Sequence, residues 1–131
     1  MSHPPLWAEI VPGTELPGVA DPIDYQRVVM NAGSTWDYFP GHYDPEYAAA
    51  QGHPAIFVNT MHIAGFIDRV ATSWAGPCSR VVRRRMTLLG SIYAGDSMVA
   101  RAGWWASGTA GWSTSRSACP TSAANCVVPP R

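Results

Sequence analysis

Residues 36–44 contain an aspartate and a histidine whose types and spacing suit acid–base chemistry. On a straight helix two side chains five residues apart point about 140° away from each other, so Asp37 and His42 would not meet. Pro40 and Gly41 favour a bend between them, because proline lacks a backbone N–H and glycine adopts conformations closed to other residues. The bend would bring carboxylate and imidazole over one small volume, where such a pair moves protons to and from a water or a substrate carbon. In a purely structural interpretation, Asp37 caps the following turn and His42 is an ordinary loop histidine.

The elements on either side must position this pair. Residues 7–22 carry three prolines and two glycines among isolated apolar residues, which is typical of an extended arm or an edge strand. Between residues 24 and 32 apolar residues recur every three or four positions, which predicts a short helix closed by Gly33. Asp44 as a cap and Pro45 at the first helical position predict a second short helix. We therefore expect the acid–base stretch between two short helices.

The longest periodic pattern in the chain covers residues 56–74 and predicts a helix with one buried apolar stripe. Asn59 is the expected N-cap, which leaves the amides of Thr60 and Met61 unpaired at the positive end of the helix dipole. His62 lies in the same segment without a second histidine or carboxylate at ligand spacing, so we leave it out of the site. No metal ligand is expected here.

After this helix the pattern changes to alternation. Residues 80–89 predict a strand with one solvated face that carries Arg83 and Arg85, while Arg84 interrupts the apolar face. Residues 93–96 predict a turn, and residues 97–100 the start of another strand. These elements together predict an α+β fold, in which the long helix packs against an antiparallel sheet.

Composition limits the classes of function. A chain of 131 residues fits one domain, and its nine arginines balance nine carboxylates with no lysine, so no net charge favours nucleic acid or an anionic membrane. The N-terminal residues lack the basic and apolar sections of a signal peptide, and we expect a cytoplasmic protein. Three cysteines without zinc spacing indicate free thiols, with no structural metal and no disulfide framework.

The motifs together resemble the MaoC-like dehydratases and (R)-specific enoyl-CoA hydratases of the hot-dog fold, over about residues 7 to 100. The residues that carry the resemblance are Asp37-x-x-Pro40-x-His42, Ala48, Gln51-Gly52, Ile56 before the long helix, and the turn Tyr93-x-Gly95-Asp96. Residues 57–77 are similar, in particular, to small single-domain subunits that pair with a second hot-dog chain and hydrate CoA esters of steroid side chains.

The resemblance implies a single hot-dog domain, with a sheet wrapped around one central helix. It also implies a hydratase that adds water to trans-2-enoyl-CoA thioesters and gives (R)-3-hydroxyacyl-CoA, with no cofactor beyond the CoA of the substrate. Asp37 and His42 would be the catalytic residues, and Thr60, with Asn59, would bind the thioester oxygen. The chain would assemble as a homodimer or with a second hot-dog chain. Two alternatives are a non-catalytic subunit that completes a partner's site and a hot-dog thioesterase.

Three features depart from the family pattern. Phe39 and Thr60 stand where the family usually has asparagine and glycine. From Arg101 onward the chain has little of the alternation expected for strands, so residues 1–100 are expected to form the hot-dog domain and residues 101–131 an atypical, coil-like tail with C-terminal strands missing or altered. Our hypothesis for the tail is a frameshift in a GC-rich gene.

Overall fold

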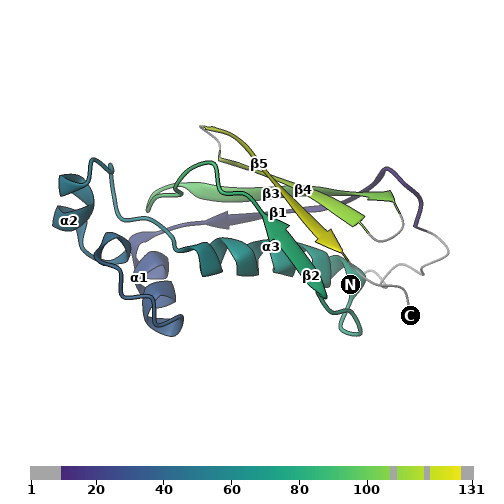
Figure 1. Ribbon diagram of the computed structural model, residues 1–131, viewed down its shortest axis with the longest axis horizontal. Helices are drawn as coiled ribbons and strands as arrows, with labels where there is room; N and C mark the ends of the chain where they lie inside the picture. The colour runs from purple at the N-terminus through teal and green to yellow at the C-terminus, as the bar shows by residue number, and fades with distance from the viewer. Residues whose placement is uncertain (1–9, 107–108, 117–118, 128–131) are drawn as a thin grey trace.

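Five antiparallel strands form a sheet that lies over one long helix (Figure 1). The computed structural model describes the backbone of residues 10–106, 109–116 and 119–127 and the side chains of residues 10–104. The strand order is β1-β3-β4-β5-β2, with β1 and β2 at the edges. The elements are β1 (Thr14–Pro22), α1 (Tyr25–Ser34), the 3-10 turn η2 (Pro40–His42), α2 (Pro45–Ala50), α3 (Thr60–Ala75), β2 (Arg83–Met86), β3 (Ser97–Ala106), β4 (Thr109–Arg116) and β5 (Cys119–Val127).

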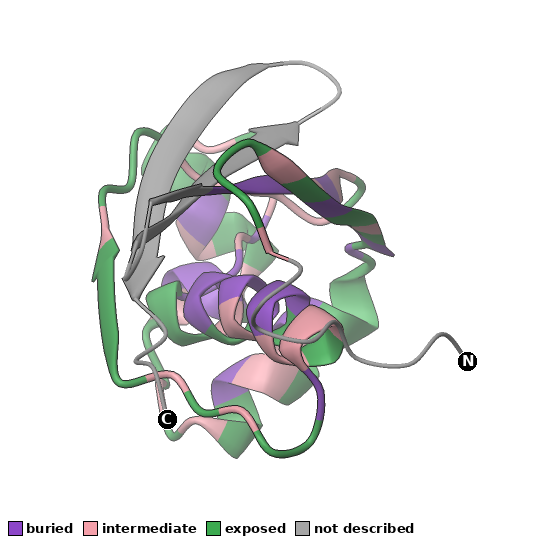
Figure 2. Cartoon of the chain, turned by 90° about the vertical axis from the view of Figure 1, so that its right-hand side faces the viewer, coloured by how far each residue is buried: buried purple, intermediate pink, exposed green. Residues whose placement is uncertain are grey.

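Helix α3 forms the centre of the core. Its buried residues recur at helical spacing and gather in the middle of the molecule, under the sheet (Figure 2). They are Ile63, Ala64, Phe66, Ile67, Val70 and Ala71. Asn59 caps the helix, as the sequence predicts, and its side chain accepts a hydrogen bond from the backbone amide of His62 at 2.9 Å. The packing of these buried residues therefore fixes the orientation of α3, including its first turn.

Edge strand β1 confirms the expectation for the proline-rich segment. Its pairing with β3 shifts register between Leu16 and Val19, at Pro17 and Gly18. Proline cannot donate to a strand ladder, so its position at a bulge on an edge strand causes no loss of pairing. The two short helices α1 and α2 lie together at one end of α3 (Figure 1), which confirms that the acid–base stretch runs between two helices.

Strands continue after Arg101, where the sequence predicts a coil-like tail with C-terminal strands missing or altered. Strand β3 continues to Ala106, and β4 and β5 complete the sheet. Along β3 the residues Met98, Ala100, Ala102 and Trp104 are buried, and the neighbours at positions 97, 99 and 101 are more exposed. Two of these four side chains are alanines. The alternation of apolar and polar residues is therefore weak and hard to recognise from the sequence.

The change in composition at Arg101 therefore falls within β3 and not at the end of the sheet. The frameshift hypothesis stays a prediction, which sequencing the locus tests. A single-base insertion or deletion near codon 101 that restores a strand-patterned reading frame would support it.

Both ends of the strand predicted at residues 80–89 differ from expectation. The predicted strand at residues 80–89 is shorter, because only Arg83–Met86 pair with β5. Arg84, which interrupts the apolar face of the predicted strand, turns toward α3, where its guanidinium pairs with the Asp68 carboxylate. No helix in the described part of the chain is long and apolar enough to cross a membrane.

Candidate active site

Asp37 is placed by the way α1 ends. The sequence predicts that Gly33 closes this helix, but the helix continues to Ser34. Trp36 instead takes the left-handed conformation, with φ 57°. The amide of Trp36 donates to Gly33 O at 3.3 Å and the amide of Asp37 to Ala32 O at 3.0 Å, the hydrogen-bond pair of a Schellman motif. A tryptophan in this conformation costs roughly 1–2 kcal/mol, which the two hydrogen bonds help to offset. The backbone of Asp37 is thereby locked to α1.

His42 is placed by the bend that the sequence predicts. Pro40 opens the turn η2, and the amide of His42 donates to Phe39 O at 2.9 Å. The amide of Asp44 then donates to Pro40 O at 2.8 Å, which continues directly into the cap of α2. His42 is therefore fixed between two short elements and is 6% exposed.

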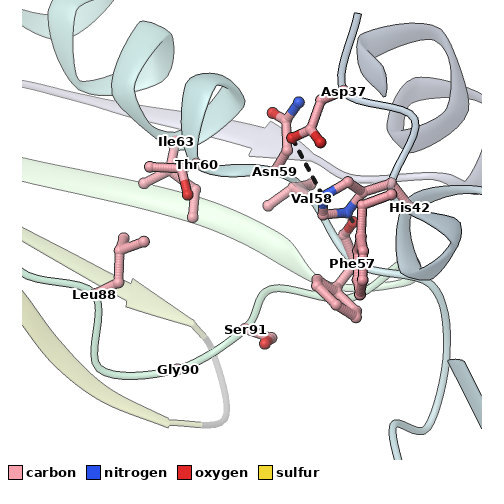
Figure 3. Close-up of a pocket in the computed structure, with 11 residues that line it drawn as sticks. Asp37, His42, Phe57, Val58, Asn59, Thr60, Ile63, Leu88, Gly90 and Ser91 are labelled. Carbon is pink, nitrogen blue, oxygen red and sulfur yellow. Dashed lines mark hydrogen bonds and ion pairs between the residues drawn. The ribbon is translucent and has the colours of Figure 1, made fainter. Parts of the chain in front are cut away.

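The two side chains meet. The distance from His42 Nε2 to Asp37 Oδ2 is 3.4 Å, and the imidazole is far more buried than the carboxylate (Figure 3). On its other side, His42 Nδ1 lies 2.7 Å from Phe57 O. A carbonyl oxygen only accepts hydrogen bonds, so Nδ1 carries a proton and Nε2 is the atom that gains or loses one. The basic nitrogen therefore faces Asp37.

The structural interpretation of Asp37 as a cap does not hold. The turn η2 has Phe39 at its N-cap position with no side-chain hydrogen bond, and among the described residues no backbone amide donates to the Asp37 carboxylate. This carboxylate, about one-third exposed, contacts His42 and is otherwise free to bind a small molecule.

Aromatic rings enclose the histidine. The rings of Phe39 and Phe57 both meet His42 edge-on, with centroids 5.4 and 5.1 Å away. Gly41 makes this packing possible, because a Cβ at that position would lie 2.6 Å from the Phe39 ring and 2.9 Å from the Phe57 ring. The imidazole is thus held in an apolar setting with only its Nε2 edge directed at the carboxylate.

A cavity of about 310 Å³ opens beside the pair. Figure 3 shows Asp37 and His42 on one side of it, the start of α3 next to them, and the segment after β2 across from them. The lining residues are Asp37, Phe39, His42, Phe57, Val58, Asn59, Thr60, Ile63, Leu88, Gly90 and Ser91. All four residues expected in the site therefore line one cavity.

The first turn of α3 contributes donors to this cavity. Asn59 is 3% exposed, and its side-chain amide donates to Thr35 Oγ1 at 2.6 Å while its oxygen caps the helix. Among the described residues, no hydrogen bond reaches the backbone amides of Thr60 or Met61. These amides at the positive end of the helix dipole suit an oxygen that gains negative charge, and Asn59 acts as the brace that holds them.

Sequence reasoning missed the acceptor that orients His42. Phe57 contributes it through a backbone carbonyl, a group that every residue has, so no side-chain type signals it. Leu88, Gly90 and Ser91 reach the cavity only through the path of the chain after β2. Within the described residues no group of three histidine, cysteine or acidic side chains is arranged to hold a metal ion.

The arrangement can activate water. Nε2 of neutral His42 and the carboxylate of Asp37 are both hydrogen-bond acceptors, and a water molecule has two hydrogens to donate to them. When the oxygen of that water attacks an electrophilic carbon, the pair takes up the released proton and can return it to a neighbouring carbon. The amide of Thr60, which lines the cavity, can stabilise a carbonyl oxygen that becomes negatively charged in the same step.

Comparison with known proteins identifies the family. The model of the MaoC like domain matches residues 10–117. The chain belongs to the MaoC-like domain family. A curated relative is the 3-oxo-4,17-pregnadiene-20-carboxyl-CoA hydratase beta subunit of Mycobacterium tuberculosis (strain ATCC 25618 / H37Rv), 34% identical over 88 residues that span 67% of this chain and 68% of the relative.

Solved structures confirm the α+β hot-dog fold of this MaoC-like chain. The ChsH1-ChsH2 complex from Mycobacterium tuberculosis contains a chain that superposes with a TM-score of 0.87 and 27% identity, over 92% of this chain and 98% of that one. The (R)-hydratase from A. caviae involved in PHA biosynthesis gives a TM-score of 0.78 with 18% identity, over 94% and 98%. The family match also extends through β4, beyond the end of the resemblance seen in the sequence.

The substitution Gly41→Ala tests the packing around His42. We expect the added methyl group to cost about 1–3 kcal/mol of stability, since two rings must move, and to lower any activity that depends on His42 by about tenfold. Gly65→Ala is the matched control: Gly65 lies in α3 with open space around its Cβ position, so this variant should be up to about 1 kcal/mol more stable. Urea unfolding of both variants measures the difference, and equal stabilities would contradict the packing described.

His62 belongs to a different environment from the Asp37–His42 pair. Its Nδ1 is buried without a hydrogen-bond partner among the described residues. Burial lowers the pKa of His62 below its ordinary value of 6.5, the Asp21 carboxylate opposes this shift, and Arg27 adds to it. Asp21 itself is paired with the guanidinium groups of Arg27 and Arg69. His62 is therefore a structural histidine near an ion-pair cluster, which agrees with its exclusion from the site.

This shift predicts a pH dependence of stability. The unfolded chain takes up a proton on His62 near pH 6.5, whereas the folded chain does so only at lower pH. The stabilisation is therefore complete above 6.5 and is lost as the pH falls toward the lower pKa of the folded state. We expect His62→Gln to lose less stability than the wild type between about pH 7.5 and about pH 5.5 in urea unfolding. Identical losses in the two proteins would show that His62 is not responsible.

Proposed function

We propose that this chain hydrates trans-2-enoyl-CoA thioesters to (R)-3-hydroxyacyl-CoA at the site formed by Asp37 and His42. The observation that carries the proposal is the approach of the two side chains to 3.4 Å beside the unpaired amides at the start of α3. In the proposed reaction His42 takes a proton from water, the water oxygen bonds to the β-carbon, and the Asp37–His42 pair delivers that proton to the α-carbon. The amide of Thr60 stabilises the thioester oxygen while the charge lies on it.

The departures from the family pattern are compatible with this chemistry. Phe39 replaces a polar contact by a ring that packs on His42, which keeps the imidazole in place. Thr60 adds a side chain at the donor position but leaves its backbone amide unpaired. Catalysis by the pair therefore does not depend on either missing family residue.

For the acyl group we propose the CoA ester of a steroid side chain. The curated relative is a hydratase named for such a thioester. The apolar side chains that line the cavity include Phe57, Val58, Ile63 and Leu88, which suits a ring-bearing hydrocarbon. A panel of short, medium and steroid-type enoyl-CoA esters tests this choice, and a preference for the short ester would contradict it.

We further propose that a second hot-dog chain completes the site. One chain of the ChsH1-ChsH2 complex superposes on this chain over nearly its whole length. Leu88 and Leu89, which follow edge strand β2 beside the cavity, are 43% and 68% exposed, and β2 pairs on only one side in the described part of the sheet. Light scattering should therefore show a dimer or a heteromer, and a monomer that hydrates substrate alone would contradict this proposal.

Incubation with crotonyl-CoA and with a steroid-type enoyl-CoA tests the reaction itself. Loss of the enoyl absorbance without release of free thiol indicates hydration. Release of thiol would indicate a thioesterase, and no reaction in the presence of the partner chain would indicate a non-catalytic subunit. A cytoplasmic location is part of the same proposal, and fractionation of cells tests it.

A further inference from the structure

The carbonyl that orients His42 belongs to a segment that is held from both sides. The amide of Phe57 donates to Gly41 O at 3.1 Å, which ties the segment to the turn that contains His42. Two more backbone hydrogen bonds pair it with the segment before β3: Val58 N to Ile92 O and Ala94 N to Ile56 O, each 2.9 Å. The position of Phe57 O relative to His42 therefore depends on residues outside the acid–base motif.

Two polar side chains pack on the Phe57 ring. The His53 ring packs on it with centroids 4.5 Å apart, and the Tyr93 ring meets it edge-on at 6.2 Å. His53 Nδ1 and the Tyr93 hydroxyl are 3.1 Å apart and form a hydrogen bond. Neither residue lines the cavity. The Phe57 ring thus contacts both the His53–Tyr93 pair and His42.

We propose that His53 and Tyr93 are positioning residues for His42. Their hydrogen bond fixes the two rings that pack on Phe57. The Phe57 carbonyl thereby keeps its hydrogen bond with His42 Nδ1, and His42 Nε2 stays directed at Asp37. Without this support the Phe57 segment moves and the imidazole populates orientations in which Nε2 no longer faces the carboxylate. The kinetic part of this inference rests on the proposed hydratase function, whereas the orientation of the ring does not.

Enzyme kinetics test the first part, on the full chain together with its partner subunit where hydration requires one. We expect His53→Ala to lower kcat by about tenfold and to change KM by less than about twofold, because misplacement of a catalytic group acts on the chemical step. His53→Gln retains a planar polar group beside Tyr93 and should restore most of the loss. Tyr93→Phe, which removes the hydroxyl and keeps the ring, should lie between them.

Rescue by the conservative variant separates positioning from a general loss of structure. Asp37, the charged group that faces His42, is unchanged in every variant. A lower kcat in His53→Ala with no rescue by His53→Gln would overturn the proposal.

Nuclear magnetic resonance of the imidazole nitrogens tests the orientation without activity. In the wild type the ring of His42 should show protonated Nδ1, and in His53→Ala this signal should shift toward that of a solvent-exposed imidazole. Tyr25→Phe is the control, because the Tyr25 hydroxyl donates to Tyr43 O, 2.9 Å away, and does not contact Phe57. An unchanged His42 signal in His53→Ala would overturn the proposal even if the wild type hydrates enoyl-CoA, and a shifted signal would support it even if it does not.

Discussion

Replacement of His42 by alanine is expected to lower the rate of enoyl-CoA hydration by about a hundredfold or more, the loss typical for a general base. Nε2 is the one atom of the imidazole that can accept a proton from water, because Nδ1 is committed to Phe57 O. Alanine leaves the Asp37 carboxylate without a partner to share the proton. The effect should fall on kcat, since the cavity walls that bind the acyl group remain.

Asp37→Asn should cause a loss of similar size for a different reason. The amide has nearly the shape of the carboxylate, so the Schellman motif and the cavity are preserved, but it carries no charge to hold the imidazolium that forms when His42 takes a proton. The measurement is the initial rate of absorbance loss with saturating substrate. Near-normal rates in either variant would remove the proposed site.

Two further residues provide matched controls for these variants. His62→Gln removes a half-buried histidine that lies outside the cavity, and Asp68→Asn removes a carboxylate that pairs with Arg84. Both should hydrate the substrate at nearly the rate of the wild type. A comparable loss in the controls would show that the effects at Asp37 and His42 come from damage to the fold.

The convergence of Asp37 and His42 could be predicted from the sequence because it depends on local chemistry. Pro40 restricts the backbone between the two residues to a tight turn, and the caps at Asp44 and Asn59 use side chains that bond within their own helix turn. Such features involve neighbours in the chain, so residue type is enough to identify them.

The parts that sequence did not reveal depend on contacts between distant segments. Trp36 closes α1 in a conformation that usually calls for glycine, and the hydrogen bonds of the closed turn make it possible. Phe57 reaches His42 from fifteen residues away through a backbone group. Strands β4 and β5 exist through pairing with β3 and with each other, in a stretch whose composition alone indicates coil.

The second large effect is expected in the core. Ile67 is 1% exposed and lies on the buried stripe of α3, so Ile67→Ala removes packed apolar surface and leaves a cavity. We expect a loss of about 2–5 kcal/mol, a large part of the roughly 5–15 kcal/mol that stabilises a domain. Urea unfolding measures it against Met30→Ala on α1, which shortens a side chain that is 62% exposed and should change stability by less than about 0.5 kcal/mol.

Ile67→Ala should lower the stability without lowering the rate of hydration, because Ile67 lies about two turns along α3 from the Thr60 and Met61 amides. At a temperature where Ile67→Ala is still folded, its kcat should stay close to that of the wild type, while its unfolding midpoint drops. His42→Ala should show the opposite combination, a normal midpoint with a low kcat. If Ile67→Ala instead lost less than about 1 kcal/mol, α3 would not be the centre of the core, and the helix start could not be the rigid support that the proposed binding of the thioester oxygen requires.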